Sequence, residues 1–150
     1  MHSVRNILQR KGSQVAHISE NASVLDAARQ MNQRRIGALV VTRGESVIGI
    51  FTERDVLNRV VAEQLDPSAT LVSEVMTQPV AVCPPNATRA DCRAVMKENR
   101  IRHLPVVEND QLVGIVSIGD LIEDDCVEQE ETIQYLYEYM MGGFREPARA

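Results

Sequence analysis

Hydrophobic residues along this chain follow two spacings, and the order of the spacings predicts its elements. Apolar residues at every third or fourth position from Val24 to Met31 predict a helix with one buried face. Short runs rich in β-branched residues at 15–18, 38–42 and 47–51 predict strands. The first third of the chain therefore reads strand, helix, strand, strand, with a second helix expected to start near the end of the last strand.

The same pattern returns 65 positions later. Residues 15–57 and 80–122 align without a gap. Two copies are too few for a solenoid, so the repeat predicts one compact body with internal two-fold symmetry. The identities that carry it are Val15-Ala16 with Val80-Ala81, Asn21-Ala22 with Asn86-Ala87, Asp26 with Asp91, Met31 with Met96, Arg35-Ile36 with Arg100-Ile101, Leu39 with Leu104, Gly49-Ile50 with Gly114-Ile115, and Asp55 with Asp120.

Local signals place the ends of these elements. A hydroxyl precedes a carboxylate by three positions at Ser23 and at Thr88, which is the spacing of a capping box at a helix start. The two N-x-[ST] motifs at the same places are therefore interpreted as helix starts and not as glycosylation sites. Turn residues at 43–45 and 108–110 lie between paired strands and predict two hairpins.

The chain divides into three parts on this reading: a first unit at 1–66, a second at 67–125 and a tail at 126–150. A linker is expected at 62–70, and residues 123–131 are strongly acidic. The tail has its own apolar stripe and is expected to form a helix that packs on another copy of the chain, in preference to folding back. The stripe consists of Ile133, Leu136, Tyr137, Met140 and Met141, and Gly142-Gly143 follow it.

Composition narrows the function classes. The sequence is 44% hydrophobic and 25% charged, as in globular proteins, and its formal charge of −5 argues against nucleic acid or an anionic membrane as a partner. No signal peptide or membrane-spanning run is expected. The three cysteines form no C-x-x-C pair, which indicates a reducing, cytoplasmic location. The histidines and cysteines show no metal-binding spacing, and no residue is placed to activate Cys83 as a nucleophile.

The strongest chemical signal follows the second strand of each hairpin. Gly49 and Gly114 are each followed three positions later by a hydroxyl, and six positions later by Asp55 or Asp120. A carboxylate at a helix entrance can accept two hydrogen bonds from a ribose diol, and helix-start N–H groups can donate to phosphate. The alternative is purely structural: the hydroxyl is an N-cap and the acid completes a capping box.

These segments resemble the cystathionine-β-synthase (CBS) domain, and two copies resemble the pair known as a Bateman module. The resemblance covers roughly residues 4–125, and residues 100–107 with 114–120 are similar to the family's strongest signature. It implies an α/β (α+β) fold of two β-α-β-β-α units paired through their sheets. It also implies a non-enzymatic, stand-alone module of bacterial type. Such a module binds AMP, ADP, ATP, NAD(H) or S-adenosylmethionine between the units and regulates another protein.

The resemblance implies two unequal sites. The site expected to hold a charged nucleotide better has Asp120 on the ribose and Arg102 with His103 on phosphate, although His103 could also be a solvated histidine at the strand edge. Its full set is Val15, Ala16, Ile36, Arg102, His103, Ile115, Ser117 and Asp120.

The other site has Asp55 on the ribose. Gly37 and Ala38 replace the phosphate-binding pair there, and Arg35 or Arg54 could compensate. Its full set is Gly37, Ala38, Ile50, Thr52, Arg54, Asp55, Thr77, Val80, Ala81 and Ile101. A homodimer is expected in either case. The alternative function is a ligand-independent dimerisation scaffold whose pockets are vestigial.

Overall fold

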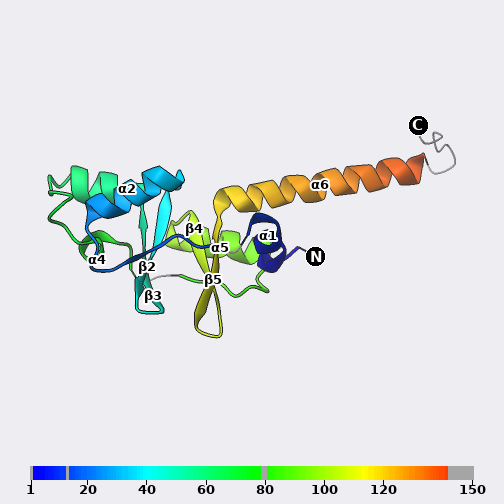
Figure 1. Cartoon of the computed structure of the whole chain (residues 1–150). Helices are drawn as coiled ribbons and strands as arrows, with labels where there is room; N and C mark the ends of the chain where they lie inside the picture. The colour runs from blue at the N-terminus through cyan, green and yellow to red at the C-terminus, as the bar shows by residue number, and fades with distance from the viewer. Residues whose placement is uncertain (1, 13, 79–80, 142–150) are drawn as a thin grey trace.

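The computed structural model describes residues 2–12, 14–78 and 81–141, and its elements follow the predicted order twice (Figure 1). In the first repeat they are β1 (His17–Ser19), α2 (Val24–Arg34), β2 (Ala38–Arg43), β3 (Ser46–Thr52), α3 (Glu53–Asp55) and the π-helical segment η1 (Val56–Val61). In the second they are α5 (Arg89–Asn99), β4 (His103–Glu108), β5 (Gln111–Ser117) and α6 (Ile118–Met140). Two short helices, α1 (Val4–Lys11) and α4 (Val72–Val75), precede the repeats.

Both predicted hairpins are confirmed, and their registers agree to the residue. Ala38 pairs with Thr52 in β2–β3, and His103 pairs with Ser117 in β4–β5. β1 lies parallel to β2, but it begins at His17, so the predicted start of this strand at residue 15 is wrong. Among the described residues of the second repeat, only one bridge of this strand remains, from Cys83 to Val106. Two prolines follow Cys83, and proline has no N–H to continue a ladder.

The helix starts are confirmed as well. The Ser23 hydroxyl accepts a hydrogen bond from the Asp26 N–H at 3.1 Å. Thr88 and Asp91 exchange reciprocal bonds of 3.1 and 3.0 Å, which completes a capping box. These residues therefore satisfy free N–H groups at the starts of α2 and α5, as their spacing predicts.

The two repeats exchange their preceding helices. The Val4 N–H donates to the Ala87 carbonyl at 2.9 Å, so α1 packs on the second repeat. The Val72 N–H donates to the Ala22 carbonyl, also at 2.9 Å, so α4 packs on the first. Each repeat thus buries its own core with a borrowed helix, and a division of the chain at residue 66 follows the sequence but not the packing.

The expected C-terminal helix is present and continues the last helix of the second repeat. α6 runs without a break from Ile118 to Met140, across the boundary at residue 125, and extends as a rod away from the two repeats (Figure 1). Its 23 residues span about 35 Å. Gly142 and Gly143 lie outside the described residues. Within the described chain, no helix combines the length and the apolar character that crossing a membrane requires.

Candidate functional site

A cavity with a volume of about 330 Å³ lies between the two repeats and contains Asp55. One wall comes from the end of β3 and the helical turn after it, and the opposite wall comes from the end of α5 and the start of β4. Volumes from about 300 to 1,000 Å³ are usual for small-molecule sites. The lining residues are Gly37, Ile50, Thr52, Glu53, Arg54, Asp55, Asn58, Arg59, Thr77, Asn99, Arg100, Ile101, Arg102 and His103.

Asp55 is a buried carboxylate at the base of this cavity, with 5% of its surface exposed. Its Oδ2 accepts from the Thr52 N–H at 3.0 Å, and its Oδ1 accepts from the Thr77 hydroxyl at 3.1 Å. Thr52 is the N-cap of α3, so the structural role that its spacing predicts is real. These two partners are neutral hydrogen-bond donors, and the Arg59 guanidinium lies 3.8 Å from Oδ1. A carboxylate offers about four lone-pair positions, so Asp55 can accept further hydrogen bonds from a ligand.

Basic side chains dominate the rim. Arg54, Arg59, Arg100 and Arg102 line the cavity with only two carboxylates, Glu53 and Asp55. Arg59 is partly engaged, because it donates to the Met76 carbonyl at 2.7 Å and its Nε lies 3.8 Å from Asp55. Guanidinium groups bind phosphate with paired hydrogen bonds, so this rim suits an anionic ligand.

His103 is the first residue of β4 and lies between this cavity and Asp120. Burial and the positive charges of Lys11 and Arg102 lower the pKa of His103, although Asp120 and Glu53 act in the opposite direction. These effects favour the neutral form of the imidazole. A neutral imidazole can donate one hydrogen bond to a phosphate oxygen but adds no charge.

The cavity brings together most of the set predicted around Asp55. Gly37, Ile50, Thr52, Arg54, Asp55, Thr77 and Ile101 all line it. Ala81 lines a neighbouring hollow of about 120 Å³, which also contacts Ile50 and Thr77. Ala38 is buried in the sheet beside the cavity, where it pairs with Thr52. Val80 lies outside the described residues.

The set predicted around Asp120 is not brought together in this way. Arg102 and His103 line the Asp55 cavity instead, and Ile36 lines a shallow surface hollow beside Gly37. The Ala16 carbonyl accepts a hydrogen bond from the Val40 N–H at 3.1 Å, so Ala16 takes part in the sheet of the first repeat. Val15 directly precedes it in the sequence. The structure therefore gathers fewer of the residues predicted around Asp120 than of those predicted around Asp55 into one cavity.

Lys11 of α1 pairs with Asp120, the carboxylate predicted to bind a ribose. Its Nζ donates to Asp120 Oδ2 at 2.5 Å and to the Ile115 carbonyl at 2.9 Å. Burial acts to raise the pKa of Asp120, but hydrogen bonds from Lys11 and from the Ser117 N–H outweigh it and hold the pKa below its usual value. The stabilisation from this ion pair is present above the ordinary carboxyl pKa and is lost as the pH falls through the lower value.

Sequence reasoning missed five residues of the cavity: Glu53, Asn58, Arg59, Asn99 and Arg100. A usable signal existed for Arg59, which follows Asp55 by four positions and so shares its helix face. Arg100 adopts a left-handed conformation with φ of 54° where it ends α5, and the equivalent Arg35 does the same at the end of α2. Glycine usually takes this position, so nothing in the sequence marked it as a helix end.

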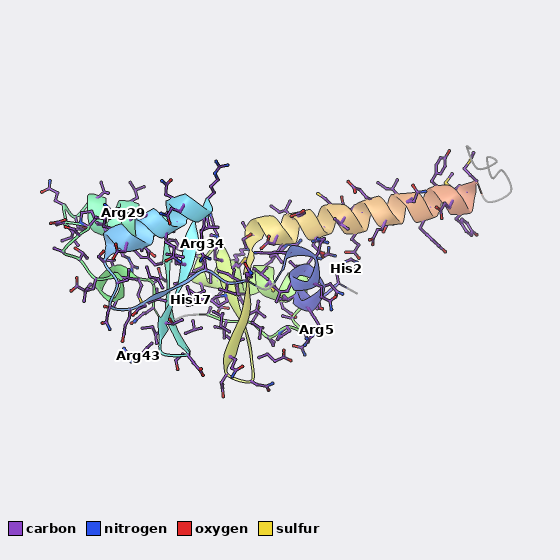
Figure 2. All side chains as sticks on the ribbon, in the orientation of Figure 1. His2, Arg5, His17, Arg29, Arg34 and Arg43 are labelled. Carbon is purple, nitrogen blue, oxygen red and sulfur yellow. The ribbon has the colours of Figure 1, made fainter. Side chains whose placement is uncertain are left out.

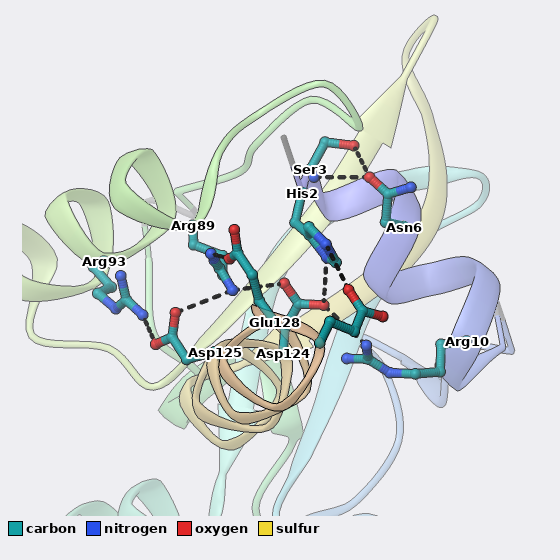
Figure 3. Close-up of polar contacts among 10 residues, drawn as sticks. His2, Ser3, Asn6, Arg10, Arg89, Arg93, Asp124, Asp125 and Glu128 are labelled. Atoms are coloured by element: carbon teal, nitrogen blue, oxygen red, sulfur yellow. Dashed lines mark hydrogen bonds and ion pairs between the residues drawn. The ribbon is translucent and has the colours of Figure 1, made fainter. Parts of the chain in front are cut away.

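A second polar cluster fixes α6 to the rest of the chain (Figure 3). Asp124, whose side chain is fully buried, lies 3.0 Å from both Arg10 of α1 and Arg89 of α5. His2 contributes a further contact at 3.4 Å. Arg89 also pairs with Asp125 and Glu128. The cluster links three helices from distant parts of the sequence.

The cavity residues offer a carboxylate acceptor and cationic donors, whereas the Cys83 thiol lies outside the cavity. A hydrogen bond with Cys92 and burial both raise the pKa of the Cys83 thiol, which makes it a poor nucleophile. No group of three or more metal-ligating side chains occurs among the described residues. Asp55 can accept hydrogen bonds from hydroxyl groups. The surrounding arginines can pair with phosphate, so together these residues offer the chemistry that nucleotide recognition requires.

Comparison with known proteins identifies the same family by two routes, a family model and individual relatives. The CBS domain family matches residues 4–62 and 72–125. The chain is 37% identical over 121 residues to the CBS domain-containing protein YhcV of Bacillus subtilis, covering 81% of this chain and 84% of YhcV. It is 35% identical over 127 residues to the mitochondrial CBS domain-containing protein CBSX3 of Arabidopsis thaliana, covering 81% of this chain but 62% of that longer relative.

Solved structures of similar proteins share the fold. A candidate signal-transduction protein with CBS domains from Burkholderia ambifaria superposes with a TM-score of 0.81 at 37% identity, covering 85% of this chain and 96% of that one. The hexameric CBS-CP12 protein from bloom-forming cyanobacteria superposes with a TM-score of 0.75 at 29% identity, covering 94% and 86%.

Proposed function

Because this chain belongs to the CBS domain family and carries two copies of the domain, we propose that it is a regulatory module that senses an adenosine nucleotide. The ligand class is AMP, ADP, ATP or NAD(H). The observation that carries the proposal is the cavity between the repeats, where a buried carboxylate lies among four arginines. The ribose hydroxyls would bond to Asp55, and the phosphate would pair with the arginines at the rim.

The position of the cavity suggests how binding would be signalled. Asp55 and Arg54 belong to the first repeat, whereas Arg100 and Arg102 belong to the second. A ligand that contacts both walls stabilises the arrangement in which the walls are close, and it shifts the equilibrium by its difference in affinity for the two arrangements. A partner protein would read that difference, and the chain itself would catalyse nothing.

Calorimetric titration of AMP into variants of the two equivalent carboxylates tests the proposal. We expect Asp55→Ala to weaken AMP binding about tenfold to a hundredfold, since charge-assisted hydrogen bonds are worth about 1.5–3 kcal/mol. Asp120→Ala removes the same group from the equivalent position and should leave the affinity at the Asp55 cavity nearly unchanged. Asp55→Asn, which keeps the shape of the side chain, separates loss of charge from loss of packing.

A panel of AMP, ADP, ATP, NAD, NADH and S-adenosylmethionine, read as shifts in melting temperature, selects the ligand. A ligand at a hundred times its Kd stabilises the folded state by about 2.7 kcal/mol. No stabilisation by any of the six would contradict the nucleotide proposal and favour the scaffold function.

Arg102→Ala separates recognition of phosphate from recognition of the nucleoside. Arg102 lines the cavity and has an exposed side chain, so it is free to turn toward a ligand. We expect the variant to bind AMP about tenfold more weakly and adenosine as well as the parent does, because only phosphate pairs with a guanidinium. Arg93→Ala, an arginine on α5 that pairs with Asp125, is the control. Equal loss of AMP and adenosine would contradict the phosphate assignment.

We further propose that the module is a homodimer formed through its last helices. Side chains project along the whole length of α6 (Figure 2). Among them, apolar residues at intervals of three, four or seven positions are exposed. Leu57 and Val61 of η1, at 61% and 60% exposure, are the counterparts of Ile122 and Cys126 in the first repeat. Exposed apolar residues gathered on one face of a helix mark protein interfaces. The residues on the α6 face are Ile118, Ile122, Cys126, Ile133, Leu136, Tyr137 and Met140.

A single added charge tests this interface. Light scattering at micromolar concentration is expected to give twice the 16.7 kDa mass of one chain. Leu136→Glu should raise the dimer dissociation constant about tenfold to a hundredfold, because burying a leucine is worth about 1.5–3 kcal/mol. Gln134→Glu adds the same charge two positions away, off the apolar face, and should leave the dimer intact. A parent protein with the mass of one chain would refute the proposal.

A further inference from the structure

The helices α1 and α4, each of which packs on the opposite repeat, begin in equivalent positions but end differently. Leu8 of α1 packs against Gly114 of β5, and Met76 at the end of α4 packs against Gly49 of β3. In both places a Cβ on the glycine would collide with the incoming side chain. The helices therefore enter equivalent positions, each on the opposite repeat.

The chain from the start of α1 to the first repeat is three residues longer than the chain from the start of α4 to the second repeat. Eleven positions separate Val4 from Val15, whereas eight separate Val72 from Val80. Three residues are about one helical turn, and α1 is indeed eight residues long where α4 has four. The extra turn brings Lys11 to the end of α1, beside the second repeat.

Lys11 makes the two hydrogen bonds that Thr77 makes in the other half. After α4 the chain is extended, so the Thr77 N–H donates to the Ile50 carbonyl at 2.9 Å and its hydroxyl donates to Asp55 at 3.1 Å. In the second repeat the single ammonium of Lys11 reaches both counterparts, the Ile115 carbonyl at 2.9 Å and Asp120 at 2.5 Å. A cation thus stands where the first repeat has a neutral residue.

We infer that Lys11 acts as an internal ligand that closes the Asp120 site, so that each chain binds one nucleotide, at Asp55. This inference rests on the proposed function. A ribose hydroxyl at Asp120 would have to displace an ammonium–carboxylate ion pair, in which both partners are charged, and put in its place a hydrogen bond in which only the acceptor is charged. The Leu8 side chain, held against Gly114, anchors the helix that carries Lys11.

The ion pair can be tested without any nucleotide, because Lys11 and Lys97 are the only lysines of the sequence. Lys97 is exposed on α5 and serves as an internal reference. Brief acetylation followed by peptide mass spectrometry should modify Lys11 about tenfold more slowly than Lys97. Asp120→Asn should bring the two rates together. Equal rates in the parent protein would overturn the inference.

Titration with AMP tests the closure itself. The parent should bind one AMP per chain, Lys11→Ala should bind two, and Lys97→Ala should bind one. Asp55→Ala combined with Lys11→Ala should retain the newly opened site alone. Two AMP per chain in the parent, or one in Lys11→Ala, would overturn the closure and leave the proposed function standing.

The two proposals fail in distinguishable ways. If Lys11→Ala binds AMP but the parent does not, the closure is supported and the assignment of the Asp55 cavity is wrong. If neither protein binds any adenosine ligand, the proposed function is wrong, and the closure is overturned with it because opening then reveals no site. Slow acetylation of Lys11 in that case identifies the ion pair as a structural contact only.

Discussion

Phe51→Ala is expected to lower the free energy of unfolding by about 3–5 kcal/mol. Phe51 is the largest of the fully buried side chains and stands in the core of the first repeat, where β3 packs beneath α2 and η1. Truncation removes its transfer free energy from water and leaves a cavity, which neighbouring side chains on paired strands fill only in part. The total free energy of unfolding of a domain of this size is about 5–15 kcal/mol, so the expected loss is a large fraction of it.

Urea denaturation at fixed protein concentration measures the effect. Leu65→Ala removes a leucine that is 43% exposed beyond η1, and it should cost less than about 1 kcal/mol. Because each repeat has its own core, the amides of the first repeat should lose more hydrogen-exchange protection than those of the second. A cost below that of Leu65→Ala would show that the core is not packed as described.

Asp124→Ala is expected to lower the free energy of unfolding by about 3 kcal/mol, at the lower end of the range for removing one partner of a buried ion pair. The Asp124 carboxylate is fully buried and lies 3.0 Å from both Arg10 and Arg89. The loss stays moderate because Arg89 keeps Asp125 and Glu128 as partners, and Arg10 is 36% exposed and can reach water.

Asp125→Ala provides the matched control on the same helix. Its carboxylate is 31% exposed and should contribute no more than about 1 kcal/mol, as surface ion pairs do. In a double-mutant cycle, Arg10→Ala should cost much less when Asp124 is already absent. Additive costs of Arg10→Ala and Asp124→Ala would contradict the direct interaction, and an equal cost for Asp125 would contradict the special role of the buried carboxylate.

Contacts between near neighbours in the sequence were open to prediction. The hydroxyl of Thr52 caps the helix that contains Asp55, and Thr88 does the same for Asp91, because both partners lie within one turn of each other. The hairpins follow for a similar reason: runs rich in β-branched residues on both sides of a short turn can pair in few registers. The 65-residue repeat then predicted two equivalent units, and the fold confirms them.

The two sites were predictable only in part. Most residues expected around Asp55 line the cavity, because the β3–α3 junction that carries Asp55 is local. Arg102 and His103 belong to the repeat that carries Asp120, yet they line the cavity of the other repeat. The two-fold arrangement places the start of β4 across from the end of β3, and no local pattern encodes that crossing.

By itself, the sequence determined the duplicated β-α-β-β-α unit, the helix caps and the acidic residue at each helix entrance, since all of these depend on side chains a few positions apart. Only the tertiary structure decided which helix covers which repeat and which of the two acids faces a cavity. Lys11 meets Asp120 across 109 positions because α1 packs on the second repeat and runs one turn longer than α4. Hydrophobic periodicity reports that a helix has a buried face, but not the surface against which that face is buried.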